Sequence, residues 1–422
     1  MSNHVSHAHA LRQSLALARL LPAQTVPLIE GLGRIAAETV RAPFDLPGFD
    51  NSAMDGYSVR FADLAEDGPT TLPVRDQILA GDLRPRVLVP GSAMAIMTGA
   101  TMPEGADTVV IHERCQVENG QVVIPAGVKA GANVRPADDD CVAGSTVVSQ
   151  GQVLEAGRLS LLAAFGRQTV QVRTRPRVAV LVTGDELVPP GQPLVRGQRH
   201  DSNGLLLAGL VSEAGGQVVA LVHCGDDPEQ LREQLQTLAD QTDLLLTSGG
   251  VSAGVADLLP GLIAELGTVA YWKVAMKPGM PVLCARIGNT VVFGLPGNPV
   301  SAGVTFQVLA RPVLEAMLGR SASGLITGHA RLAQPWHKHH GRLEFLRCSV
   351  VVDTGGALLA TPYRHQGSGA LSVLASADGL LVLPEGAHTF KAGTRLPLMA
   401  WRVGSGNPNG LDGNDGVAAT PP

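Results

Sequence analysis

The sequence predicts a multi-domain protein in which a central, doubly wound α/β domain is flanked by β modules, in an elongated four-domain architecture. The length of 422 residues exceeds the roughly 250–300 residues that a single hydrophobic core usually supports. Between residues 177 and 319, buried strands alternate with helices, which is typical of a parallel sheet covered on both faces. Short strands separated by proline and glycine turns precede and follow that segment.

The first elements predicted are helical, and a β module comes next. Residues 1–40 look helical, and one face of an amphipathic helix is marked by Leu11, Leu15, Ala18 and Leu21. Prolines then punctuate short strands over 46–134, where Asn119-Gly120 predicts a type I′ hairpin.

The central domain begins with a buried strand at 177–182, and Asp201-Ser202-Asn203 caps the helix that follows. Asp227-Pro228 starts the next helix, with proline at its first position. The remaining predicted elements are a strand at 243–247, a helix near 255–266, strands near 268–274, 281–286 and 290–295, and a helix at 299–318.

A second β module follows, in which 343–352 and 357–363 form a hairpin. The tail is rich in Gly, Asn and Pro, and we expect it to be disordered. The predicted domains are 1–45 with 135–172, 46–134, 173–320 and 325–403, followed by the tail at 404–422.

Composition argues against several classes of function. Aromatic residues make up 3% of the chain and the net charge is −5, so we expect binding neither to nucleic acid nor to an anionic membrane. The five cysteines form no C-x-x-C pair, which favours reduced thiols in a cytoplasmic protein over disulfides or structural zinc. No apolar run is long enough to cross a bilayer.

Three glycine-rich loops follow predicted strands of the central domain, at Thr183–Glu186, 248–257 and 294–299. Ligands of open α/β sheets bind outside the carboxyl ends of the strands, and such loops present backbone N–H groups to oxyanions. None of the loops has the P-loop or dinucleotide-binding pattern. The predicted cofactor-binding residues are Thr183, Gly184, Ser248, Gly249, Gly250, Pro296, Gly297 and Asn298.

Charged residues suggest two further features. Lys273 and Lys277 are four residues apart, so on one strand they would share a face and could neutralise an anionic ligand, although solvent-facing lysines remain an alternative. Carboxylates suit Mg²⁺, which also accepts phosphate and water. A possible metal-ligand set consists of Asp55, Asp140, Glu186 and Asp257, which the sequence alone cannot bring together.

Nine motifs in order resemble the molybdopterin molybdotransferases, namely the bacterial MoeA proteins and the E domain of gephyrin. The resemblance covers all but the first ten residues and the tail. The motifs are FDNSAMDGY (49–57), IMTGATMPEGADTVV (96–110), NVRPADDD (133–140), TGDEL (183–187), DSN (201–203), SGGVSAG with Asp257 (248–257), the segment 272–281, GLPGNPVS (294–301) and GSG-A-LS (367–372).

The resemblance implies a homodimer whose composite site combines a pterin-binding α/β domain with the partner's β "lasso" domain. It implies that molybdate and adenylylated molybdopterin (molybdopterin-AMP) react with the help of Mg²⁺, releasing AMP, and that a molybdopterin adenylyltransferase acts upstream. The dithiolene of the pterin supplies the sulfur ligands of the metal, so no protein cysteine pair is required. The implied functional positions are Asp55, Thr98, Asp140, Glu186, Asp257, Lys273, Lys277 and Ser368.

The sequence departs from the family pattern at two places. Val255 stands where the family usually has glutamate, and Cys141 replaces an aliphatic residue. The acidic ligand could be any of Asp138, Asp139 or Asp140. Two alternative functions remain open: adenylylation of molybdopterin, which uses the same α/β fold, and a non-enzymatic scaffold.

Overall fold

The computed structural model describes residues 4–251 and 258–404. The chain forms two compact units. The first unit comprises 1–38, 150–155 and the chain from 169 onward, and the second comprises 39–149 and 156–168, each within the described residues. The predicted helix at 255–266 is described from Leu259, and the predicted tail lies almost entirely outside the described residues.

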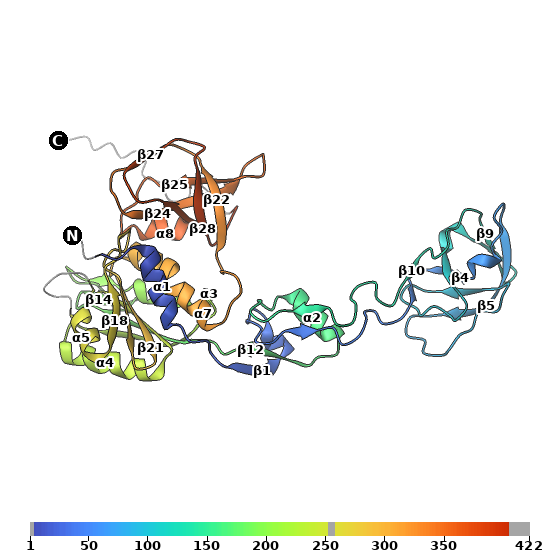
Figure 1. Cartoon of the computed structure of the whole chain (residues 1–422), viewed down its shortest axis with the longest axis horizontal. Coiled ribbons are helices and arrows are strands. Elements are labelled where there is room, and N and C mark those ends of the chain that lie inside the picture. Colours follow the sequence, from blue (N-terminus) through green and yellow to red (C-terminus); the bar gives the residue numbers. More distant parts are fainter. Residues whose placement is uncertain (1–3, 252–257, 405–422) are drawn as a thin grey trace. The chain divides into compact units, whose positions relative to one another are not determined.

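The first unit contains a six-stranded sheet of order β16-β13-β17-β21-β20-β18 (Figure 1). Strands β16, β13, β17 and β21 are parallel, whereas β20 and β18 run antiparallel to their neighbours. The strands are β13 (Arg177–Thr183), β16 (Gln217–Cys224), β17 (Leu244–Ser248), β18 (Thr268–Trp272), β20 (Leu283–Ile287) and β21 (Thr290–Leu295).

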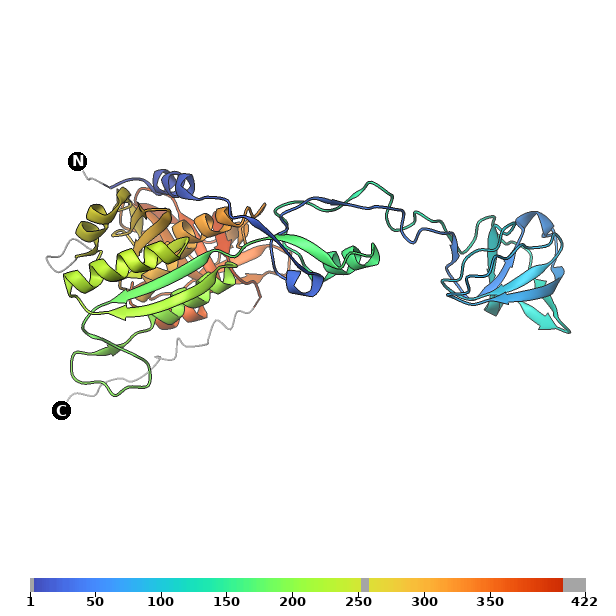
Figure 2. The same cartoon turned by 90° about the horizontal axis from the view of Figure 1, so that it is seen from below.

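Helices cover both faces of this sheet, which confirms the doubly wound prediction (Figure 2, from below). Residues of β13 alternate between two cores: Val178 and Val180 pack toward one face, and Ala179 and Leu181 toward the other. The first face is covered by α1 (His7–Leu17), α3 (Asn203–Glu213), α6 (Pro299–Thr305) and α7 (Arg311–Met317), and the second by α4 (Pro228–Gln241) and α5 (Leu259–Leu266).

The predicted helix at 299–318 is interrupted by a π-helical turn over Phe306–Ala310, between α6 and α7. Pro312 follows this turn and has no N–H to donate to the carbonyl of Val308, four residues earlier. The imidazole Nε2 of His7 lies 3.2 Å from that carbonyl oxygen and serves as a replacement partner. Burial lowers the pKa of His7, because it disfavours the charged imidazolium.

The C-terminal part of the first unit is a β-barrel (Figure 1). It closes because β26 pairs with both β28 and β24, and β24 with β25 is the predicted hairpin. The elements are β22 (Ile326–Leu332), β24 (Leu343–Val352), β25 (Leu358–Pro362), β26 (Gly379–Leu383) and β28 (Arg395–Ala400), with β23 (Trp336–Lys338), β27 (His388–Phe390) and α8 (Leu371–Ser376) beside them.

The second unit contains a six-stranded sheet of order β7-β4-β6-β5-β9-β8. Asn119 and Gly120 have φ values of 53° and 76°, so the predicted type I′ hairpin is confirmed. A Cβ on Gly56 would lie 2.1 Å from the carbonyl oxygen of Val110, which explains why glycine stands there. The strands are β4 (Gly56–Val59), β5 (Thr70–Ile78), β6 (Ala93–Ile96), β7 (Thr108–Ile111), β8 (Gln116–Glu118) and β9 (Gln121–Ile124).

The prediction that residues 1–40 are mainly helical is wrong. Helix α1 ends at Leu17, and β1 (Ala23–Pro27) then pairs with β12 (Thr169–Arg173). Of the predicted apolar face, Leu11, Ala18 and Leu21 pack against the core, whereas Leu15 stays 38% exposed. The fully buried residues of α1 are Ala10 and Ser14, whose hydroxyl is hydrogen-bonded to Tyr271.

The remaining elements are short. They are β2 (Val40–Arg41), β3 (Asn51–Ser52), β10 (Val134–Arg135), β11 (Thr146–Val148), α2 (Ala156–Ala164), β14 (Leu187–Val188), β15 (Arg199–His200) and β19 (Met276–Lys277). All five cysteines are free thiols. Across residues 4–251 and 258–404, no helix has both the length and the apolar character that a membrane crossing requires.

Candidate functional site

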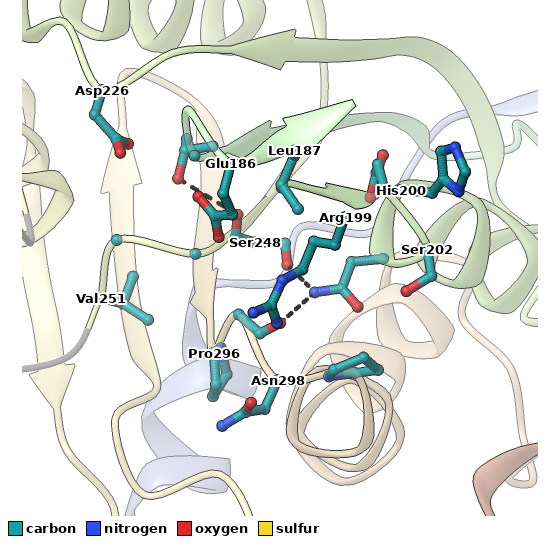
Figure 3. A pocket seen from close by; sticks show the side chains of 18 of the residues that line it. Glu186, Leu187, Arg199, His200, Ser202, Asp226, Ser248, Val251, Pro296 and Asn298 are labelled. Carbon is teal, nitrogen blue, oxygen red and sulfur yellow. Dashed lines mark hydrogen bonds between the residues drawn. The ribbon is translucent and has the colours of Figure 1, made fainter. Parts of the chain in front are cut away.

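A cavity of about 430 Å³ lies at the carboxyl ends of the parallel strands in the first unit (Figure 3). It falls between β13 and β17, from which the chain connections diverge, and this is where open α/β sheets bind ligands. The three predicted glycine-rich loops all contribute to its wall. The predicted residues lining it are Thr183, Gly184, Glu186, Ser248, Gly249, Gly250, Pro296, Gly297 and Asn298.

Asn203 joins two of these loops from the start of α3. Its side-chain amide donates to the hydroxyl of Ser248 at 2.8 Å and to the carbonyl of Gly297 at 2.7 Å. The side chain is buried, so losing either bond would leave a polar group without a partner. Asn203 was predicted to cap the helix and to belong to the DSN motif, but not to join the loops; the cap contact is made by Asp201, which accepts from the N–H of Gly204.

The cavity wall carries charges of both signs. Glu186 and Asp226 supply carboxylates, and Arg199 supplies a guanidinium that is directed toward the segment of Pro296 and Asn298 in Figure 3. The backbone N–H of Arg199 donates to the carbonyl of Glu186, which fixes the two residues beside each other. Neither Arg199 nor Asp226 was predicted. The wall therefore offers a cation to an anionic ligand and carboxylates to a divalent ion.

The predicted Ser368 lies next to this cavity. Its carbonyl accepts from the N–H of Val300 at 3.1 Å, in the first turn of α6, and the neighbouring Pro299 lines the cavity. The guanidinium of Arg347 donates to the carbonyl of Gly367 at 3.4 Å. The loop at 367–369 is thus held between α6 and β24.

Arg347 is a buried cation that was not predicted from the sequence. Its exposure is 1%, and burial lowers its pKa to about 10. Its Nε has no hydrogen-bond partner among the described residues. A buried arginine within a strand of otherwise buried residues gives no periodic signal, so the pattern of β24 could not have singled it out.

The prediction that Lys273 and Lys277 share one strand face is wrong. Strand β18 ends at Trp272, and Lys273 has a φ of 70°, which turns the chain out of the sheet. Lys277 instead lies on β19, which pairs with β24 of the barrel. The ammonium of Lys273 lies 4.4 Å from the ring centroid of Trp272, whereas that of Lys277 pairs with Glu344.

The second unit contains three of the predicted residues. Asp55 and Thr98 are in contact: the backbone N–H and the hydroxyl of Thr98 both donate to Oδ1 of Asp55 at 2.7 Å. Both bonds lower the pKa of Asp55, and the bond from the backbone N–H has the larger effect. Asp140 is exposed on the same unit, and its N–H donates to the carbonyl of Leu46.

The predicted magnesium ligands are not all described. Asp257 and Val255 lie outside the described residues, whereas Glu186 belongs to the first unit and Asp55 and Asp140 to the second. Across the described ranges, no three His, Cys, Asp or Glu side chains cluster closely enough to hold a metal ion. The four-carboxylate set therefore stays a prediction.

Three family models match successive parts of the chain. They are the MoeA N-terminal region (domains I and II) at residues 5–166, the probable molybdopterin binding domain at 179–316, and the MoeA C-terminal region (domain IV) at 329–401. The cavity lies within the second match, and Ser368 and Arg347 lie within the third.

Individual proteins resemble the chain over most of its length. Molybdopterin molybdenumtransferase 2 of Mycobacterium tuberculosis is 39% identical over 383 residues, covering 89% of this chain and 94% of that protein. The molybdopterin molybdenumtransferase of Haemophilus influenzae is 35% identical, covering 89% and 94%. The fold also matches a crystal structure of the molybdopterin biosynthesis MoeA protein of Pyrococcus horikoshii OT3, with a TM-score of 0.82. The two sequences are 26% identical, and the match covers 94% of this chain and all of that one.

Proposed function

The chain belongs to the MoeA family of molybdopterin molybdenumtransferases, and from that premise we propose that it inserts molybdate into adenylylated molybdopterin and releases AMP in the cytoplasm. The observation that carries this proposal is the cavity of about 430 Å³ at the carboxyl ends of β13, β17 and β21. Its volume is within the usual range for small-molecule sites. Its wall supplies glycine-loop N–H groups and the guanidinium of Arg199, which suit the phosphates of the adenylylated pterin.

The chain's own residues would bind and orient the two substrates. Asn203 holds the loops of Ser248 and Gly297 together, which keeps their backbone donors in a fixed arrangement. Arg347 contacts the loop of Ser368, and Lys277 pairs with Glu344, which lies on the same strand as Arg347; we assign to Lys277, Arg347 and Ser368 the binding of the molybdate oxyanion. Lys273, whose ammonium lies over the ring of Trp272, contributes a further positive charge.

The cavity residues fit a magnesium ion. Glu186 and Asp226 both line the cavity, and Mg²⁺ is usually held by one or two carboxylates together with phosphate oxygens and waters. When bound there, the ion would neutralise the charge on the phosphate of the adenylate. We propose Glu186, Asp226 and Asp257 as the residues of this unit that hold it, with Asp55 and Asp140 as ligands from the second unit.

We also propose that the enzyme is a homodimer with a composite site. In this arrangement, Asp55 and Thr98 of one subunit would complete the cavity of the other. The adenylylated substrate must come from a reaction that transfers AMP from a nucleotide to molybdopterin, so an adenylyltransferase acts upstream.

The test is a molybdate titration with purified adenylylated molybdopterin, following AMP and active cofactor together. AMP release that rises and saturates with molybdate, in parallel with active cofactor, is the expected result. If the protein instead consumes ATP to form the adenylylated pterin, it is an adenylyltransferase. If it binds the pterin but turns over neither substrate, the scaffold alternative holds.

A further inference from the structure

Lys277 has a buried partner on a different element of the same unit. Strand β19 follows the α/β strand β18 in the chain and pairs in parallel with β24 of the barrel, so that Lys277 and Glu344 are direct neighbours across the ladder. The ammonium Nζ lies 3.0 Å from Oε1 of Glu344. The side chain of Lys277 is 39% exposed, whereas that of Glu344 is 5% exposed. The pair therefore has an accessible cation held by a carboxylate beneath it.

Glu344 acts on other basic groups as well. Nε2 of His340 lies 3.2 Å from the same carboxylate oxygen. Burial lowers the pKa of both Lys338 and Arg347, and in each case the charge of Glu344 offsets part of that effect. Glu344 is thus the shared counter-charge of a basic cluster that consists of Lys277, Lys338, His340 and Arg347.

This arrangement prepares Lys277 for an anionic ligand. An ammonium has three N–H donors, and Glu344 engages one of them, so the others stay available on the exposed side. A free lysine side chain loses considerable rotamer freedom when it is fixed by a ligand. Because Glu344 already restricts Lys277 in the ligand-free protein, part of that entropy cost is absent from the binding step.

We propose that Glu344 is a positioning residue for molybdenum transfer, which holds the ammonium of Lys277 where it meets the molybdate oxyanion. This rests on the proposed function, in which Lys277 contacts that anion. Glu344 itself is buried and does not touch the substrate; it acts through Lys277.

The experiment is a double-mutant cycle on kcat/KM for molybdate, with AMP release as the readout. Glu344→Gln is compared with the wild type, and the same change is made in a Lys277→Met background. We expect Glu344→Gln to lower kcat/KM about tenfold when Lys277 is present and less than twofold when it is absent. A purely structural role of Glu344 predicts the same loss in both backgrounds, and that result would overturn the proposal, as would no loss in either.

Two further variants test whether the loss comes from the position of the Glu344 carboxylate and not from the removal of any buried carboxylate. Glu344→Asp keeps the charge but draws the carboxylate back by one methylene, so we expect a smaller loss of kcat/KM that also depends on Lys277. If Glu344→Gln does not fold, Glu344→Asp takes its place in the cycle. Glu315→Gln is the matched control, because Glu315 is a buried carboxylate paired with Arg311 at 2.9 Å on α7, and we expect kcat/KM within twofold of the wild type.

The experiment distinguishes a failure of the proposed function from a failure of the link between Glu344 and Lys277. If Lys277→Met alone leaves kcat/KM for molybdate unchanged, Lys277 does not contact the anion, and the premise fails rather than the link between the two residues. If Lys277→Met lowers kcat/KM but the effect of Glu344→Gln does not depend on it, the link fails while the premise stands.

Discussion

The two units present their candidate residues in different ways. In the first unit, three loops from neighbouring strands enclose a cavity, and the buried amide of Asn203 connects two of them. In the second unit, Asp55 and Thr98 form a hydrogen-bonded pair on an exposed surface. One arrangement is a cavity lined by several loops, and the other is a carboxylate fixed on a surface by two donors from one residue.

This difference shows how each unit can contribute to one reaction. A cavity selects and encloses a small molecule, because it removes water and presents donors from several sides. An exposed carboxylate whose geometry is fixed by two donors keeps its charge but cannot select a ligand by itself. The second unit therefore gains a function when another surface supplies the substrate, and this motivates the composite dimer.

The largest expected effect is a loss of stability in the second unit that leaves the first unit unchanged. Gly56→Ala would place a methyl group 2.1 Å from the carbonyl oxygen of Val110, so β4 and β7 must move apart. We expect the second unit to lose about 3 kcal/mol or more of stability. Hydrogen exchange of the full chain should show lost protection in β4 and β7, while β13 and β17 keep theirs.

A matched control in the same unit is Gly157→Ala. Gly157 lies in α2, and nothing is within 4 Å of the added Cβ, so this variant should be as stable as the wild type or slightly more stable. Unchanged protection of β4 in Gly56→Ala would contradict the close-approach explanation.

The next effect concerns the cavity of the first unit. Asn203→Asp replaces the donor amide by a carboxylate oxygen opposite the carbonyl of Gly297, which leaves two acceptors facing each other in a buried place. We expect a loss of about 1–3 kcal/mol of stability and a much larger loss of AMP release than of folded protein. Asn289→Asp is the control, since Asn289 is an exposed acceptor for Arg19. Equal activity of both variants would show that the loops do not depend on Asn203.

An intermediate effect tests whether the two units cooperate between subunits. Asp55→Ala and Glu186→Ala should each be inactive as homodimers. In a mixed population, half of the dimers are heterodimers with one intact composite site of two, so roughly a quarter of wild-type activity should return. The measurement is AMP release after subunit exchange, verified with differently tagged chains. No recovery despite exchange would place the whole site within one chain.

The smallest effect is a shift of one titration. Thr98→Val removes the hydroxyl bond to Asp55 but keeps the backbone bond, so the pKa of Asp55 should rise part of the way toward its ordinary value. A carboxyl with a depressed pKa is ionised at neutral pH and loses that charge as the pH falls through the depressed value. As the pH falls, protonation of the Asp55 carboxyl should therefore begin at a higher pH in Thr98→Val than in the wild type. Carbon-detected NMR of the Asp55 carboxyl measures this, and Thr98→Ser should titrate like the wild type.

Much of the first unit follows from its sequence. The runs Val178–Val182 and Leu244–Thr247 are apolar on both faces, which is the pattern of a buried parallel strand. Once these strands are placed side by side, the loops after Thr183, Ser248 and Leu295 must meet at one edge, and the cavity was predicted there for that reason.

Other contacts could not be predicted because they depend on where single polar side chains are buried. Asn203 and Arg347 bond to groups far away in the chain, which no local pattern reports. The two lysines were placed on one face because a continuous strand was assumed, but the positive φ of Lys273 ends it. The contact of Asp55 with Thr98 links a candidate metal ligand to a residue that only the family motifs, and no periodicity, had singled out.

The π-helical turn at Phe306–Ala310 has an evolutionary consequence. A π turn accommodates one residue more than a regular α-helical turn, so the removal of a single residue would restore a continuous α-helix. The extra residue rotates everything after it by about 100°, which lets α6 face the cavity while α7 faces α1. A relative that lacks this one residue must orient α7 differently, and a one-residue gap in an alignment at this position would mark a lineage with a different attachment of the N-terminal helix.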